Sequence, residues 1–439
     1  MNNKERTALA EWVIKEAVKA GADEISAAIY NGRGINVEYR EKKLEKLQES
    51  SQNSLNLNVY ANKKYSGHST NDLKKESLQK FIEEAVASTK YLTEDEFRKL
   101  PEPKYYPEKT AGNLGVRDND YEKIESPERL KIASEIEQIA LNQSDKIISV
   151  TSGYNDNYSE GVRVHSNGFS GEWNETSFTA GASVTVKDEN SRPEDWFYAT
   201  TRFYKDVPSP EIIAKSAVER ALRKIGQKKI QSGKYPMIVE NRAGSRLFYM
   251  LYSPMTARAI QQKSSFLDGM LGQKIGSEKL TVIDDPFLEK GLSSRFYDYE
   301  GLASKKRVMI EKGILRNFYV DNYYGRKLGM EFTSGSPSNI VFEYGSKSMD
   351  DMIKDIKKGI LVNGFIGGNS NSTTGDFSFG IVGLLIEDGS IVHAINEMNI
   401  SGNAKEFWNQ LAEMGNDPYP YSSMRCPALL FDGVNFSGL

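Results

Sequence analysis

The stretch ISAAIYNGRGINVEY, residues 25–39, carries the pattern that decides the fold of the N-terminal part. Apolar side chains alternate with polar or small ones in two runs, the first from Ile25 to Ile29 and the second from Ile35 to Tyr39. This alternation is typical of a β-strand with one buried face. The dipeptide Asn31-Gly32 between the runs is a turn signal, so the pattern predicts two antiparallel strands joined there.

The same pattern extends outward on both sides of this stretch. Leu55, Leu57 and Val59 alternate again, and Asn62-Lys63 then marks a turn. Apolar residues at helical spacing from Leu9 to Ala17 and from Leu78 to Ala85 predict a helix before and after these strands. The first hundred residues are therefore predicted to form a helix–sheet–helix module.

A second module of the same kind follows a proline-rich linker at Leu100 to Pro107, since proline does not fit inside a helix or a central strand. Ser126-Pro127 and Ser209-Pro210 each predict a helix start, with serine as the N-cap and proline in the first turn. Strand-like alternation fills residues 147–203 between these two helices.

From residue 233 onward the sequence pattern changes. A strand at 235–240 and one long apolar helix at 245–262 precede short strands with glycine-rich turns, down to Phe431. The predicted fold is α+β, with two tandem helix–antiparallel-sheet–helix modules followed by a mostly antiparallel β C-terminal domain with packed helices. The expected domains are residues 1–100, 101–232 and 233–439.

Composition narrows the classes of function. The chain has 439 residues, with 57 Lys and Arg against 60 Asp and Glu, which gives a net charge of −3. This balance lacks the excess of positive charge that is typical of proteins that bind nucleic acid directly. No window of about 18 apolar residues predicts a membrane span. The N-terminal segment is broken by charges and lacks the apolar core of a signal peptide. We therefore expect a cytoplasmic protein.

The residue types that most often bind metals are scarce. His68, His165 and His393 have no second His or Glu at the helical spacing that places two ligands beside one metal ion, so packed or surface roles are expected. Cys426, the single cysteine, is followed by Pro427 and is interpreted as a small buried residue at the start of a strand.

Two further segments carry candidate chemistry, each with a structural alternative. Paired carboxylates at Asp284, Asp285, Asp298 and Glu300 can bind a divalent cation or divide acid and base roles, although carboxylates in turns are common. A glycine-rich segment can expose an edge that takes an extended peptide by strand addition, but tight hairpins explain it equally well. The peptide-contact candidates in it are Gly367, Gly368, Asn369, Gly375, Asp376 and Ser378.

A series of ordered motifs in the C-terminal half resembles the TldD/PmbA (TldE) family, the "modulators of DNA gyrase", and within it the PmbA/TldE branch. The motifs are Leu280 to Pro286, Phe296 to Gly301, Val308 to Leu315, Arg326 to Gly329, Thr374 to Ser378, Ile386 to Gly389, Ile400 to Asn403 and Gly415 to Asp417. The N-terminal part agrees through its helix–sheet–helix plan and through His165-Ser-Asn-Gly168.

The resemblance implies a cytosolic system in which a TldD-type subunit, carrying a His-Glu-x-x-x-His helix and a later Cys ligand, pairs with a TldE-type subunit and trims peptides or unfolded proteins. The corresponding helix here, at 245–262, has no His or acidic residue, and Tyr252, Ser253 and Met255 stand at the degenerate metal position. These side chains do not supply the imidazoles and carboxylate of a catalytic zinc site.

The expectation is thus a non-catalytic subunit with no catalytic or metal-binding residue and no cofactor of its own, zinc being expected only in the TldD-like partner. The expected partners are that subunit and an extended peptide or unfolded protein, and a homodimer remains open. Two alternatives stand beside this interpretation, an independent cation-dependent hydrolase built on the four carboxylates and a regulatory protein that interacts with gyrase.

Overall fold

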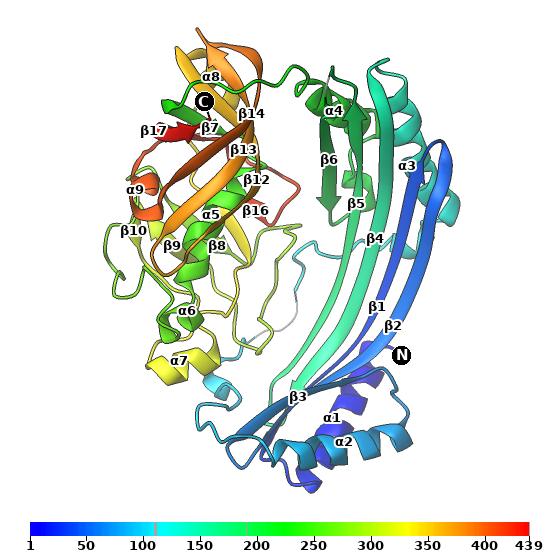
Figure 1. Cartoon of the computed structure of the whole chain (residues 1–439). Helices are drawn as coiled ribbons and strands as arrows, with labels where there is room; N and C mark the ends of the chain where they lie inside the picture. Colours follow the sequence, from blue (N-terminus) through cyan, green and yellow to red (C-terminus); the bar gives the residue numbers. More distant parts are fainter. Residues whose placement is uncertain (109–111, 190, 439) are drawn as a thin grey trace.

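The N-terminal lobe, residues 1–232, is built on one six-stranded antiparallel sheet (Figure 1). The computed structural model describes residues 1–108, 112–189 and 191–438. The strand order is β3-β2-β1-β4-β5-β6, so the two predicted modules contribute their strands to a single sheet, joined where β1 pairs with β4. The strands are β1 (Glu24–Arg40), β2 (Lys43–Ala61), β3 (Lys64–Thr70), β4 (Ile147–His165), β5 (Ser170–Val186) and β6 (Glu194–Thr201).

The predicted turn at Asn31-Gly32 is wrong, because β1 runs through it without a break. Asn31 pairs with Asn53 of β2 on one side and with Glu160 of β4 on the other. Strand pairing on both sides holds this part of the chain extended despite its local turn propensity. The turn predicted at Asn62-Lys63 is confirmed, and both residues have positive φ.

Two pairs of helices cover one face of this sheet, one pair at each end (Figure 1). The apolar odd-numbered residues between Ile25 and Val37 face these helices and are buried, which explains the alternation in the sequence. Ser209 caps its helix as predicted, whereas Ser126 is the first helical residue and Glu125 occupies the N-cap position. The helices are α1 (Asn3–Lys19), α2 (Lys75–Thr89), α3 (Ser126–Leu141) and α4 (Pro210–Leu222).

The opposite face of the sheet carries mostly small and polar side chains, with a few aromatic ones such as Trp173 and Trp196. One cross-strand row consists of Asn36, Asn155, Thr179 and Thr200. The Thr179 and Thr200 hydroxyls are hydrogen-bonded at 2.9 Å, and the Asn155 amide donates to the Ile35 carbonyl at 3.0 Å. This face is turned toward the C-terminal lobe (Figure 1).

The C-terminal lobe, residues 233–438, contains two more sheets of mostly antiparallel strands, which confirms the predicted fold class. One has the order β10-β9-β8-β11-β16, and the other β14-β13-β12-β7-β17-β15, with an extra pairing of β14 and β17 that closes the second sheet on itself. The strands are β7 (Gly233–Val239), β8 (Val282–Asp285), β9 (Arg307–Glu311), β10 (Ile314–Leu315), β11 (Asn339–Phe342), β12 (Lys358–Ser370), β13 (Asp376–Glu387), β14 (Ser390–Asn403), β15 (Leu411–Met414), β16 (Met424–Arg425) and β17 (Leu429–Ser437).

The single helix predicted at 245–262 is wrong in its middle. The chain forms α5 (Gly244–Tyr252), a 3₁₀ turn at Ser253–Met255 and α6 (Ala257–Gln261), with Thr256 extended between them and capping α6. Pro254 has no N–H to donate and its ring collides with the preceding turn of a helix, so the break falls at that residue. The other helices of this lobe are α7 (Asn322–Leu328), α8 (Met349–Lys354) and α9 (Ala404–Asn409).

Side chains from beyond α4 cover the free edge of β6, the last strand of the N-terminal sheet. Lys224 donates to the carbonyl of Glu194 at 2.6 Å, Arg242 to that of Trp196 at 2.6 Å, and Tyr419 to that of Tyr198 at 3.0 Å. An uncovered strand edge invites pairing with other chains. Two of the three donors come from the C-terminal lobe, so the same hydrogen bonds also join the lobes.

Among the described residues, no helix is long and apolar enough to cross a membrane.

Candidate functional site: a cavity between two sheet edges

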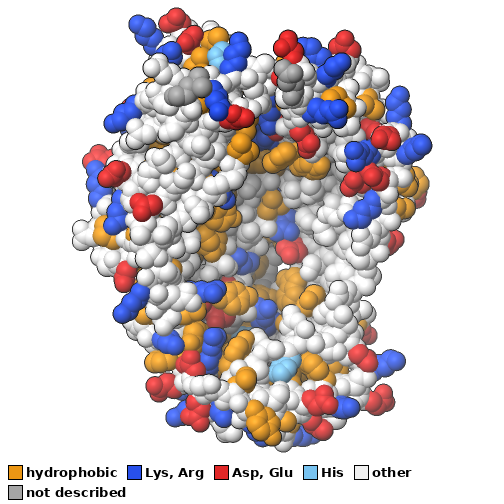
Figure 2. All heavy atoms as spheres, in the orientation of Figure 1, with side chains coloured by type: hydrophobic (Ala, Val, Ile, Leu, Met, Phe, Trp, Pro, Cys, Tyr) orange, Lys and Arg blue, Asp and Glu red, His pale blue; other side chains and the backbone are white. Residues whose placement is uncertain are grey.

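Cavities lie where the two lobes face each other, and the space-filling view shows the surface hollowed between them (Figure 2). One cavity, of about 510 Å³, lies between β5 and the segment Leu292–Tyr299. A second, of about 330 Å³, has polar residues of β1, β2 and β3 as its floor, with Tyr299 beside them. A third, of about 380 Å³, lies between β6 and β12.

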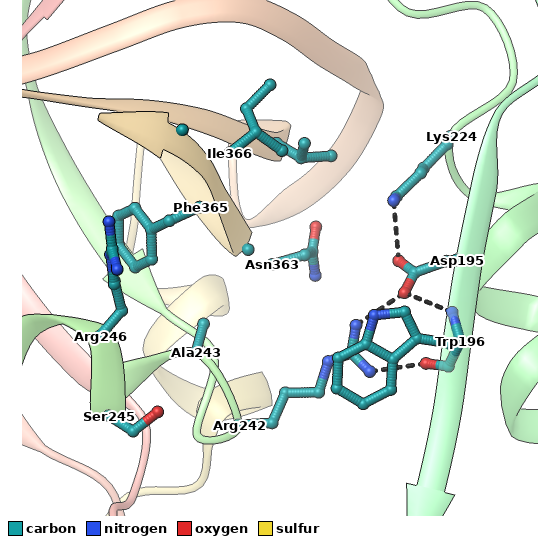
Figure 3. A pocket seen from close by; sticks show the side chains of 13 residues that line it. Asp195, Trp196, Lys224, Arg242, Ala243, Ser245, Arg246, Asn363, Phe365 and Ile366 are labelled. Carbon is teal, nitrogen blue, oxygen red and sulfur yellow. Dashed lines mark hydrogen bonds and ion pairs between the residues drawn. The ribbon is translucent and has the colours of Figure 1, made fainter. Parts of the chain in front are cut away.

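The cavity between β6 and β12, called here the edge cavity, has a charged wall (Figure 3). Asp195 of β6 is 4% exposed and forms ion pairs with Arg242 at 2.7 Å and Lys224 at 3.2 Å. Behind it, Arg220 holds Glu240 through two hydrogen bonds of 2.6 Å each. The guanidinium of Arg242 also lies over the Trp196 ring, 4.3 Å from its centroid. This network ties β6 and α4 to the segment that follows β7.

The charges of this network set the protonation of Asp195. Burial by itself raises the pKa of a carboxyl group, but Arg242, Lys224 and Arg220 together lower the pKa of Asp195 below its usual value. Asp195 is therefore a carboxylate at neutral pH, and its charge is already shared among these cations.

The opposite wall of the edge cavity is an open strand edge. β12 pairs with β7 only from Ile360 to Val362, and the last bond of that pairing runs from the Glu240 amide to the Val362 carbonyl at 3.0 Å. On its other side β12 pairs with β13 as far as its last residue, Ser370, with register shifts after Val362 and after Ile366. Within the described ranges no strand continues on the β7 side beyond Val362, so residues 363–370 present backbone groups there.

The structure places the six peptide-contact candidates in three locations. Gly367, Gly368 and Asn369 lie on the exposed part of β12. Asp376 and Ser378 lie on β13, which is paired with β12 and β14 at once, so the expectation of a free edge at these two residues is wrong. Gly375 closes the hairpin turn, where its amide donates to the Asn371 carbonyl at 2.8 Å.

The degenerate metal position offers no set of zinc ligands. Met255 is completely buried, Ser253 is exposed, and Tyr252 packs edge-on against the Tyr319 ring at 5.3 Å. Cys426 is buried at the other end of α5, where a β-carbon on Gly244 would overlap its sulfur. Burial raises the pKa of the Cys426 thiol, which disfavours the thiolate that binds metals. These residues therefore do not fit a catalytic zinc ion.

The three histidines have separate, local roles. The ring of His68 bonds the Ser66 hydroxyl at 2.7 Å, and that of His393 bonds the Ala394 carbonyl at 2.9 Å. His165 is buried beside the Tyr106 hydroxyl at 3.1 Å, and burial, with Arg163 nearby, lowers the pKa of His165 to about 3. In the described parts of the chain, no three His, Cys, Asp or Glu side chains are grouped so as to hold a metal ion.

The four candidate carboxylates are bound to separate protein donors. Asp284 and Asp285 are consecutive residues of β8 and so point to opposite faces. Asp284 accepts from the amide and hydroxyl of Ser338, and Asp285 pairs with Lys306 at 2.7 Å. The arrangement does not bring these two around one cation.

Asp298 and Glu300 do lie together, on either side of Tyr299 in the chain. Asp298 accepts from the amides of Glu300 and Leu302 at 2.9 and 3.0 Å, and Glu300 accepts from the amide of Asn322 at 2.8 Å. Burial, and then the neighbouring Asp298 charge, raise the pKa of Glu300 to about 8. The sequence named both carboxylates, but only the fold shows that Asp298 is buried and Glu300 half-buried, close enough for their charges to interact.

Comparison with known proteins assigns the chain to a family. Residues 119–225 match the PmbA/TldA metallopeptidase central domain, and residues 232–438 match the C-terminal domain of the same metallopeptidases. The chain therefore belongs to the PmbA/TldD family, as its motifs predicted.

Relatives of known sequence and structure agree with this assignment. The chain is 28% identical to the metalloprotease PmbA of Escherichia coli O157:H7, over 96% of this chain and 94% of that one. It is 39% identical to a protein of Bacteroides thetaiotaomicron described as a proposed modulator of DNA gyrase, with a TM-score of 0.97 and complete coverage of both chains. TldE of Thermococcus kodakarensis has the same fold, with 24% identity, a TM-score of 0.88 and coverage of 98% of this chain and all of that one. The metalloprotease relatives support a protease-like role.

The charged residues that line the edge cavity were missed in the sequence, whereas Gly367, which also lines it, was a peptide-contact candidate. Asp195, Lys224, Arg242 and Arg246 come from distant segments of the chain, and none of them belongs to a motif with recognisable spacing. The available signal was the glycine-rich character of β12, which located one wall only.

Proposed function

We propose that this chain is a non-catalytic, TldE-like subunit of a cytoplasmic two-subunit metalloprotease. It pairs with a zinc-bearing TldD-like subunit, completes the substrate cavity and holds an extended peptide or an unfolded segment there. The open edge of β12 beside the edge cavity is the observation that carries the peptide-holding role.

Strand addition suits a subunit that must accept many sequences. Main-chain hydrogen bonds to residues 363–370 provide affinity that does not depend on the side chains of the peptide. The exposed face of Ile366 and the half-buried Phe365 next to it add apolar contact without a shaped pocket. The polar face of the N-terminal sheet forms the opposite side of the hollow and supplies hydrogen-bonding groups.

Support for the non-catalytic role comes from the residues of α5, of the 3₁₀ turn that follows it and of α6. Between Gly244 and Gln261 the side chains are apolar, hydroxyl-bearing, amide or basic, with no imidazole, thiol or carboxylate. A zinc peptidase needs such ligands, and also a group that activates its water.

The test is a reconstitution with an unfolded substrate such as reduced, alkylated casein. Cleavage is measured for this chain alone, for a TldD-like subunit alone and for their mixture, with zinc determined by elemental analysis. We expect cleavage from the mixture only, with zinc in the TldD-like subunit. Cleavage by this chain alone with stoichiometric zinc would overturn the proposal.

A blocking variant tests the peptide-holding part of the proposal. Gly364 lines the edge cavity, and a β-carbon added there meets no atom within 4 Å. The β-carbon of Gly364→Phe therefore meets no neighbouring atom, and the substitution adds a ring at the wall of the cavity. We expect the mixture containing this variant to lose most of its activity while its melting temperature is unchanged, and full activity would contradict the role of the β12 edge.

A further inference from the structure

The edge cavity has an excess of positive charge. Three cationic side chains line it, those of Lys224, Arg242 and Arg246, against the single carboxylate of Asp195. Asp195 is already engaged by Arg242 and Lys224. The cavity walls therefore carry two positive charges more than negative ones.

Among the cations that line the cavity, Arg246 is the one without a carboxylate partner in the described parts of the chain. It is the third residue of α5 and is exposed, and among the described residues no carboxylate oxygen lies within 4 Å of its guanidinium. One of its nitrogens donates to the carbonyl of Gly368 on β12 at 3.1 Å, and the group lies over the Phe379 ring, 4.9 Å from the centroid. These two contacts fix the guanidinium beside the open edge of β12.

A guanidinium held in this way is suited to a carboxylate. It has five N–H donors in a planar fork, and a single hydrogen bond to Gly368 leaves others for a ligand. Arginine and a carboxylate form charge-assisted, frequently bidentate hydrogen bonds, which are about twice as strong as neutral ones. Because the ring of Phe379 and the Gly368 carbonyl already restrict the side chain, little further freedom is lost on binding.

We propose that Arg246 binds a carboxylate of the extended peptide that lies on the β12 edge, so that the edge cavity selects peptides with an acidic side chain or a free C-terminus near this point. The inference rests on the proposed function, since it requires a peptide on β12. Main-chain hydrogen bonds alone do not distinguish one peptide sequence from another. Arg246 adds a preference for peptides that carry a carboxylate at this point. Asp195 contributes to the selection by engaging Arg242 and Lys224 on the far wall, so that Arg246 is left with its fork of donors open to a ligand.

The test measures binding of four eight-residue unstructured peptides, labelled at the N-terminus with fluorescein, by fluorescence anisotropy. The peptides differ only in having Glu or Gln at one internal position and a free or amidated C-terminus. They are titrated with the wild-type chain and with Arg246→Gln, Arg246→Lys and, as control, Arg258→Gln. Arg258 is a second exposed arginine, on α6, that does not line the cavity.

We expect the wild-type chain to bind a peptide with the preferred carboxylate about tenfold more tightly than its neutral counterpart, as a charge-assisted bond at a partly exposed site allows. Whichever pair of peptides shows this ratio, Glu against Gln or acid against amide, identifies the source of the carboxylate. The ratio falls to about one in Arg246→Gln, is partly kept in Arg246→Lys because the charge remains, and is unchanged in Arg258→Gln. Raising the salt concentration reduces it.

Two negative results separate the inference from the function on which it rests. Equal binding of all four peptides to the wild-type chain, abolished by Gly364→Phe, would overturn the role of Arg246 and leave strand addition standing. If none of the four peptides binds, both the role of Arg246 and strand addition on β12 are overturned. A ratio that survives in Arg246→Gln would also overturn the assignment, because another group would then be holding the carboxylate.

Discussion

Replacement of Asp195 by asparagine is the sharpest perturbation of the contact between the lobes. The side chain of Asp195 is 5% exposed and lies 2.7 Å from Arg242, 3.2 Å from Lys224 and 3.6 Å from Arg220. Asparagine has nearly the same shape and retains one oxygen to accept from the Trp196 amide, which now donates to Asp195 at 2.7 Å. The change therefore removes a charge and leaves the packing almost intact.

The expected loss follows from what remains after the substitution. Removing one partner of a buried ion pair costs about 3–5 kcal/mol, because the other charge is left without compensation. Glu240 still pairs with Arg220 and lies 3.7 Å from Arg242, so part of the compensation persists. We therefore expect Asp195→Asn to lower the free energy of unfolding by about 3 kcal/mol at pH 7, at the lower end of that range.

The measurement is guanidinium chloride unfolding at 25 °C, followed by tryptophan fluorescence, with Asp206→Asn as the matched control. Asp206 also joins the lobes through an ion pair, with Lys290 at 2.7 Å, but the two side chains are 35% and 39% exposed. An exposed pair contributes about 0–1 kcal/mol, so the control variant is expected to remain close to wild type. Trp196 adjoins Asp195 and is one of the four tryptophans whose fluorescence follows the transition.

The pH dependence provides a second readout. Because the pKa of Asp195 is lowered in the folded protein, its contribution is present above the usual aspartate pKa and is lost as the pH falls through the lowered value. The difference between wild type and Asp195→Asn therefore shrinks as the pH drops below about 4. A loss no larger than that of Asp206→Asn at pH 7, or a difference that grows in acid, would refute the reasoning.

Three further changes have defined outcomes. Glu300→Gln is expected to flatten the pH dependence of stability between about pH 4.5 and 8. Burial and then Asp298 raise the pKa of Glu300 in the folded protein to about 8. The stabilising contribution of Glu300 is therefore greatest at low pH and is lost as the pH rises through about 8. Unfolding curves at several pH values measure this, and an unchanged slope would remove Glu300 as the source. Tyr419→Phe removes the donor to the Tyr198 carbonyl and should cost about 1 kcal/mol of unfolding free energy in the same assay, whereas no loss would mean that water replaces the hydroxyl. Phe431→Ala leaves a cavity at a completely buried position of the C-terminal core and should cost about 3–5 kcal/mol; a loss below about 1 kcal/mol would show that the core can close over the gap.

The sequence located most of the helices and strands because their burial is periodic. The apolar odd-numbered residues between Ile25 and Val37 keep one parity across Asn31-Gly32, and that continuity is a better guide to the single strand than the local turn signal. The turn signal failed because β2 and β4 pair with β1 on both sides at these residues. At 245–262 the local signal was the better guide. The apolar spacing favoured one continuous helix, but Pro254 breaks it between α5 and α6.

The sequence also determined the family, through motifs in fixed order, and the chemical character of the helix at 245–262. Composition and order are properties of the chain alone, so they do not depend on how it folds. Only the tertiary structure decided where the candidate site lies. Pairing partners determine which strand edges stay open, which is why Asp376 and Ser378 lie inside a sheet whereas residues 363–370 have a free side. Charges become a site only when distant segments meet, as Asp195, Lys224 and Arg246 do around the edge cavity, and that meeting depends on packing between lobes that no local pattern encodes.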